Sequence, residues 1–163
     1  MSHLRDNLQN YAEARRHLLG DPGTKYASLE EVVLAHGVAP VDKLKAPSWA
    51  TSTPKECFSN AALLAIGVGG YYTEGYLQSV IPIHHAWVTM PDGTIFDPTI
   101  DVGQERIIEA GADAYLGIPF DMAWFEKHLR KNRNYPCVMV TRSEMFNMDV
   151  LEGKFEVANV GVD

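Results

Sequence analysis

The beginning of the chain carries apolar residues with the period of an α-helix. They recur at intervals of three, four and seven positions, with charged side chains between them: Leu4, Leu8, Tyr11 and Leu18. This spacing predicts an amphipathic helix that ends at Gly20. A second, shorter helix is predicted from Ser28 to Gly37, because Ser28 and Glu31 have the spacing of a capping box.

The middle of the chain predicts a loop followed by a buried helix. Residues 38–53 lose the helical period and hold prolines and hydroxyl-bearing residues, which is typical of a surface loop. Thr53-Pro54-Lys55-Glu56 then has the form of a capping box with proline at the first helical position, so a helix should begin at Pro54. This helix is apolar nearly all round and should end at the glycines of 67–70, which is typical of a central helix.

Three strands are predicted after these glycines, over residues 71–81, 83–90 and 94–98. The last two are joined by Pro91-Asp92-Gly93, a strong hairpin signal. The final third predicts helices over 104–110, 121–131 and 143–151 and a buried strand over 138–140. The whole pattern predicts an α+β fold in a single domain over residues 1–163, with helices packed on an antiparallel sheet.

Composition excludes several classes of function. The formal net charge of −7 provides no basic surface for a nucleic-acid backbone, and the basic stretch 128–133 is interpreted as a solvated helix end. The apolar run 61–70 is too short to cross a bilayer, and the first twenty residues lack the apolar stretch of an export signal. We therefore expect a cytoplasmic protein with no nucleic-acid or membrane partner.

The two cysteines, Cys57 and Cys137, lie eighty positions apart, which does not suggest a disulfide framework. Cys57 falls in the first turn of the predicted central helix, where the helix dipole favours the thiolate form of a cysteine. A buried cysteine with a packing role is the alternative for Cys57 and the prediction for Cys137.

A nucleophilic cysteine needs a histidine within reach and a third group that orients the ring. His84 and His85 are neighbours on a predicted strand, so their side chains point to opposite faces and one of them can serve Cys57. Asp97 follows on the next strand across the hairpin and can accept a hydrogen bond from that histidine. Histidines paired with backbone carbonyls and an aspartate that shapes a turn are the structural alternatives. The usual spacing of metal ligands and of a phosphate-binding loop is absent, so we expect no metal and no cofactor.

Together these residues resemble the core of the transglutaminase-like, papain-like cysteine superfamily. The resemblance covers residues 53–99 and rests on Cys57 at a helix start, Tyr72-Thr73-Glu74-Gly75-Tyr76, His85-Ala86-Trp87 and Asp97-Pro98-Thr99. It implies that Cys57 is the nucleophile, His85 the base and Asp97 the residue that orients the base. It also implies acyl transfer through a thioester, with a protein, a peptide or a small amide or ester as substrate.

Further residues are candidates for the same site. The backbone amide of Cys57 would stabilise an oxyanion, with a second donor from Ser48, Trp49 or Thr51. The candidate substrate-binding side chains are mostly aromatic: Trp49, Asn60, Tyr72, Tyr76 and Trp87. Two other hypotheses stay open. The chain could be a catalytically silent domain that binds a protein or small ligand in the same cleft, or a structural protein in which Cys57 only packs.

Overall fold

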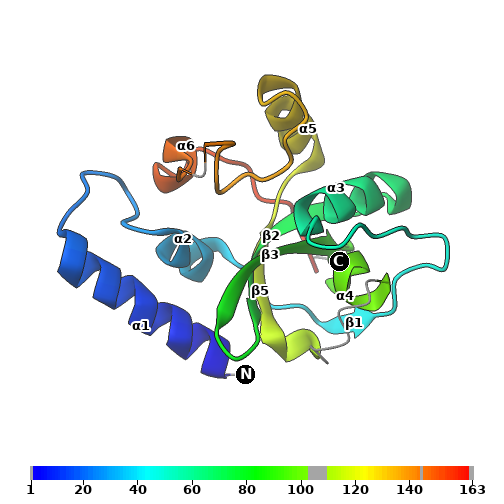
Figure 1. Ribbon diagram of the computed structural model, residues 1–163, viewed down its shortest axis with the longest axis horizontal. Helices are drawn as coiled ribbons and strands as arrows, with labels where there is room; N and C mark the ends of the chain where they lie inside the picture. The colour runs from blue at the N-terminus through cyan, green and yellow to red at the C-terminus, as the bar shows by residue number, and fades with distance from the viewer. Residues whose placement is uncertain (1, 103–109, 144, 162–163) are drawn as a thin grey trace.

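The computed structural model describes residues 2–102, 110–143 and 145–161 (Figure 1). Its centre is a five-stranded sheet with the strand order β1-β4-β3-β2-β5. The strands are β1 (Asp42–Leu44), β2 (Tyr71–Gln78), β3 (Pro82–Thr89), β4 (Thr94–Phe96) and β5 (Tyr115–Pro119). Because β1 pairs with β4 in parallel while the other pairs are antiparallel, the sheet is mixed. The predicted α+β class is confirmed, and the prediction of a wholly antiparallel sheet is wrong.

Six α-helices and a short 3-10 helix surround this sheet in the described part of the chain. They are α1 (Ser2–Leu19), α2 (Leu29–His36), α3 (Cys57–Val68), α4 (Pro98–Val102), η1 (Ala112–Ala114), α5 (Met122–Lys131) and α6 (Met148–Leu151). The starts of α2 and α5 agree with the sequence because their caps are local. Ser28 accepts a hydrogen bond from the amide of Glu31, and Asp121 accepts one from the amide of Trp124. None of the described helices is both long and apolar enough to span a membrane.

The two faces of the sheet are covered differently. One face carries the large hydrophobic cluster, in which residues of α1, α2, α3, α5 and α6 pack on the side chains of Tyr72, Ala86 and Val88. The other face carries a smaller cluster of Leu77, Trp87, Ile95 and Tyr115. Alternation along β3 therefore places His84 on the face of the large cluster and His85 on the face of the small one. In Figure 1, α3 lies along one side of the central strands and α1 and α2 lie on the opposite side of the view.

The sequence missed two elements that complete the sheet and its smaller face. β1 falls within the predicted loop 38–53, and its three residues are too few to give a strand signal in the sequence. β5 is fully buried and contains Gly117 and Pro119, which read as turn residues in the sequence. The short helix α4 was also missed. The helix predicted over 104–110 lies almost wholly outside the described residues.

The carboxyl-terminal third departs further from the prediction. Residues 138–140 do not form a strand, because the amides of Val138 and Met139 donate to the Glu74 carboxylate instead of to a neighbouring strand. Only Val140 forms an isolated bridge, with Phe146. The helix predicted over 143–151 is longer than the observed helix, α6. Asn147 is the N-cap of α6, and its side chain accepts a hydrogen bond from the amide of Asp149.

Candidate active site

Cys57 is the first residue of α3 and is half-buried. The predicted start at Pro54 is wrong, because Pro54 and Lys55 form a turn in which Lys55 has a φ of 65°. Glu56 occupies the N-cap position without a side-chain capping bond. Cys57 is therefore the first residue of the helix and not a later residue of its first turn. Backbone amides at this position have no partner inside the helix.

Asn60 ties the segment before Cys57 to the helix. Its side-chain oxygen accepts a hydrogen bond from the amide of Thr53 at 2.9 Å. Its amide nitrogen lies 2.9 Å from the carbonyl oxygen of Thr53, 3.1 Å from the hydroxyl of Ser52 and 3.0 Å from the hydroxyl of Thr99. These bonds use both ends of a buried side chain and tie the segment before Cys57 to α3, and the predicted contact of Asn60 with substrate stays a prediction.

His85 and Asp97 are brought together in the interior. The ring Nε2–H of His85 donates to Asp97 Oδ2 at 2.7 Å, and the hydroxyl of Tyr115 donates to the same oxygen at 2.9 Å. The other oxygen, Oδ1, accepts from the amides of Thr99 and Ile100 at the start of α4. The carboxylate is thus fixed by two strands and one helix, and it holds the His85 ring in one orientation.

His85 and Asp97 each stabilise the charged form of the other. Burial opposes protonation of His85, but the adjacent carboxylate of Asp97 and the nearby Cys57 outweigh it and raise its pKa from 6.5 to about 10. Burial alone would raise the pKa of Asp97, yet the His85 ring and the Tyr115 hydroxyl hold it below its ordinary value. At neutral pH the arrangement therefore favours an imidazolium beside a carboxylate, with the Cys57 sulfur as the third member.

The first two residues of α3 meet the two consecutive histidines of β3. Cys57 interacts with His85, and the ring of Phe58 lies 5.1 Å from the ring of His84. On the side of β3 that faces β4, strand pairing is limited to Val88 and Thr89. Among the described residues, no strand therefore covers this edge of β3 at the two histidines, and the start of α3 can approach them there.

Sequence reasoning missed a buried carboxylate at the centre of the molecule. Glu74 is fully buried, and its two oxygens accept hydrogen bonds from five groups. These are the Tyr72 hydroxyl, the His84 ring, the Cys137 thiol and the backbone amides of Val138 and Met139. Burial would raise the pKa of Glu74, but the bonds from His84 and the two amides hold it below its ordinary value. Glu74 is the only charged residue of the strand predicted over 71–81, and this was the signal available in the sequence.

Glu74, His84 and Cys137 also place three potential metal-ligand atoms within 4.8 Å of one another. Burial and the Glu74 charge raise the pKa of the Cys137 thiol well above its ordinary value, so it keeps its proton and donates to Glu74. The Glu74 oxygens also accept the backbone amides of Val138 and Met139. The cluster is therefore a hydrogen-bond centre that joins β2, β3 and the 137–139 segment.

The predicted aromatic ligands lie in different environments. Tyr72 and Trp87 are fully buried in the core, and their predicted roles in substrate binding stay predictions. Trp49 is exposed, but its ring lies against Gly67 at the far end of α3, ten residues or about 15 Å of helix from Cys57. Tyr76 lines a groove of about 410 Å³ together with His84, so its predicted role stays a prediction.

The second oxyanion donor was expected from Ser48, Trp49 or Thr51. The bonds to Asn60 hold the adjoining residues Ser52 and Thr53 beside the first turn of α3. The choice among Ser48, Trp49 and Thr51 stays a prediction. Tyr115 was not foreseen, because the strand that carries it gave no signal in the sequence.

Comparison with known protein families, with curated proteins and with solved structures finds no match for this chain.

Proposed function

We propose that the chain is a cysteine-dependent acyl-transfer enzyme with a transglutaminase-like, papain-like core. The observation that carries the proposal is the arrangement at the start of α3. Half-buried Cys57 lies beside His85, whose Nε2 donates to the buried carboxylate of Asp97. Three residue types suited to nucleophilic catalysis thus converge from a helix, a strand and a strand end, although they span forty positions of the sequence.

We infer a role for each member from this geometry. The bond to Asp97 keeps one proton on Nε2, so Nδ1 is the ring nitrogen that holds the proton given up by Cys57 in the thiolate–imidazolium pair. Sγ of Cys57 then attacks the carbonyl carbon of an amide or ester, and the π electrons move to the carbonyl oxygen. When this tetrahedral adduct collapses, the bond to the leaving amine or alcohol breaks and the leaving group takes the proton from His85. A thioester on Cys57 results.

The second half of the reaction reverses these roles. His85 takes a proton from water or an amine, which attacks the thioester carbon, and Sγ leaves as the thiolate. Water as acceptor gives a hydrolase, and an amine gives a transglutaminase-like transferase. In both halves the free backbone amide of Cys57 would stabilise the oxyanion, a contribution of about 3 kcal/mol for one such donor. The substrate class we propose is a protein, a peptide or a small amide or ester.

The proposal is tested by trapping the thioester. The wild-type chain is mixed with 4-nitrophenyl acetate, and intact-protein and peptide mass spectrometry locate any acetyl group. We expect a burst of nitrophenolate and a single acetyl adduct on Cys57. Cys137 is the internal control, because it is buried and its thiol stays protonated.

Three variants separate catalysis from simple thiol reactivity. Cys57→Ala should abolish the burst, and His85→Ala should slow it strongly. Asp97→Asn should slow it less, because the ring is still held but in the wrong tautomer. Acetylation that reaches Cys57 no faster than it reaches a cysteine in the unfolded chain would contradict the proposal and favour a catalytically silent domain that binds a ligand near the same residues.

A further inference from the structure

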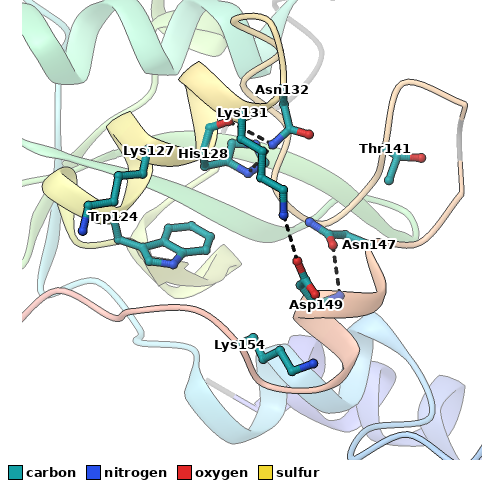
Figure 2. A pocket seen from close by; sticks show the side chains of 9 residues that line it. All are labelled: Trp124, Lys127, His128, Lys131, Asn132, Thr141, Asn147, Asp149 and Lys154. Carbon is teal, nitrogen blue, oxygen red and sulfur yellow. Dashed lines mark hydrogen bonds and ion pairs between the residues drawn. The ribbon is translucent and has the colours of Figure 1, made fainter.

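A second pocket, of about 210 Å³, lies between α5 and the segment that follows α6 (Figure 2). None of its lining residues belongs to the candidate active site. Three of them are lysines: Lys127, Lys131 and Lys154. This concentration of positive charge stands out on a chain with a formal net charge of −7.

The lysines converge from two separate segments. Trp124, Lys127, His128 and Lys131 have the spacing that places residues on one face of a helix, and this face of α5 forms one wall of the pocket. Lys154 comes from the opposite wall, after the end of α6 (Figure 2). Arg130 is not among the lining residues and pairs with Glu126 on the same helix. The pocket is therefore distinct from the basic helix end that the sequence displays.

The positive charge in the pocket is only partly neutralised. Lys131 lies 3.3 Å from the carboxylate of Asp149, the acidic residue that lines the pocket. Lys127 and Lys154 form no ion pair with a described residue. Burial lowers the pKa of His128, and its ring is occupied by the carbonyl oxygen of Cys137 and the side-chain amide of Asn132. Three lysines and one carboxylate thus line the pocket.

The neutral polar groups of the pocket are largely engaged within the protein. Asn147 donates to the carbonyl oxygen of Val138 and accepts from the amide of Asp149. The faces of the Trp124 ring stack with Phe120 and His128, so its edge is the part available to a ligand. In Figure 2 the nitrogen of this indole points toward the segment that carries Lys154. The groups free to contact a ligand are therefore mainly hydrogen-bond donors.

We propose that this pocket binds the phosphate group of a small molecule. Phosphate oxygens accept several charge-assisted hydrogen bonds at once, and flexible lysines supply them as point charges. The indole N–H of Trp124 would add a neutral donor. This inference is independent of the chemistry proposed for Cys57.

The test is a titration of the full chain with inorganic phosphate and with adenosine 5′-monophosphate at constant ionic strength. Calorimetry gives the affinity, and the indole N–H signals in an NMR spectrum report the location. The signal of Trp124 is identified with the Trp124→Phe variant. We expect saturable binding that shifts the Trp124 signal and leaves those of Trp49 and Trp87 in place. Tighter binding of the ester would identify an organic phosphate as the ligand, and equal affinity would identify free phosphate.

A matched pair of variants separates a built site from general charge attraction. Lys127→Gln/Lys154→Gln removes two pocket cations that have no described ion-pair partner, and should weaken binding about tenfold or more. Arg130→Gln/Arg133→Gln removes the same charge from residues outside the pocket and should change the affinity less than about twofold. Equal losses in the two variants, a Trp124 signal that does not move, or no saturable binding up to about 10 mM would overturn the proposal.

Discussion

At the scale of single residues, Glu74 shows how one buried side chain can organise distant parts of the chain. Its carboxylate accepts bonds from β2, from β3 and from the 137–139 segment, which lies more than sixty positions away. Removal of a buried carboxylate with this many donors should destabilise the folded state, because the donors would be left without partners in the interior.

Replacing this carboxylate should destabilise the fold. Glu74→Gln puts an NH₂ group where only acceptors fit, so the free energy of unfolding should fall by about 3 kcal/mol. Urea unfolding measures the change. The matched control is Glu126→Gln on α5, whose side chain is 60% exposed and should change stability by less than about 0.5 kcal/mol. Equal effects of the two variants would show that Glu74 is not the centre we describe.

His85 predicts a pH dependence of stability with a definite sign. Its pKa in the folded chain is raised from 6.5 to about 10, so the folded state binds its proton more tightly than the unfolded state does. The resulting stabilisation is complete below pH 6.5 and is lost as the pH rises to about 10. The stability difference between the wild type and His85→Gln should therefore shrink over this range in urea titrations. A difference that stays constant would contradict the assigned charge state.

At the scale of elements, the start of α3 depends on bonds across the chain and not on its own capping sequence. Thr53 and Glu56 have the spacing of a capping box, yet the amide of Thr53 donates to Asn60 instead. The same Asn60 also bonds to Thr99, just beyond Asp97. One side chain therefore fixes the distance between the helix that carries Cys57 and the segment that carries Asp97.

Asn60→Ala should loosen this connection. We expect a loss of about 2 kcal/mol in stability, because the amide of Thr53 and the hydroxyl of Thr99 lose a buried partner. The rate at which Cys57 is alkylated should fall as well. If Asn60 only stabilised the fold, its substitution would leave this rate unchanged as long as the chain stays folded. Ser59→Ala on the same turn is the control, and its effect on both measurements should be small. Unchanged alkylation in Asn60→Ala would limit Asn60 to a structural role.

At the scale of the whole molecule, the first helix, α1, contributes Leu4 and Leu8 to the large hydrophobic cluster. The sequence pattern placed Leu4, Leu8, Tyr11 and Leu18 on one apolar face. The structure buries Leu4 and Leu8, but leaves Leu18 79% exposed and Tyr11 44% exposed. In Figure 1 the carboxyl-terminal end of α1 lies away from the sheet. The end of α1 is instead held to α2 by Arg16 and Glu31, at 2.8 Å.

Two substitutions on this helix should therefore have very different effects on the free energy of unfolding. Leu8→Ala should lower the free energy of unfolding by about 3 kcal/mol, because it leaves a cavity in the core. Leu18→Ala should change it by less than about 0.5 kcal/mol, because the side chain is largely in solvent. Thermal or urea unfolding of both variants checks this, and similar losses would mean that α1 packs differently from the arrangement described.

The sequence predicted what local chemistry determines. The caps at Ser28 and Asp121 and the hairpin at Pro91-Asp92-Gly93 specify their own geometry, and the structure has α2, α5 and the β3–β4 turn there. Elements that depend on distant partners were not predictable. β1 exists because it lies beside β4, and the 137–139 segment is shaped by Glu74.

The candidate site divides in the same way. Cys57, His85 and Asp97 stand in recognisable motifs, and the structure brings His85 and Asp97 into direct contact. Tyr115 and the anchoring role of Asn60 arise from tertiary contacts between residues far apart in the sequence. No local pattern could have indicated them.

The most direct test of the account is the rate at which iodoacetamide alkylates Cys57 as a function of pH. Peptide mass spectrometry follows Cys57 with Cys137 as internal control, in the wild type and in His85→Ala. We expect fast labelling well below pH 8.5, about the pKa of an ordinary thiol, and loss of that labelling in His85→Ala. A wild-type Cys57 that reacts no faster than an ordinary thiol, or reacts equally fast without His85, would contradict the thiolate–imidazolium pair on which the proposed function depends.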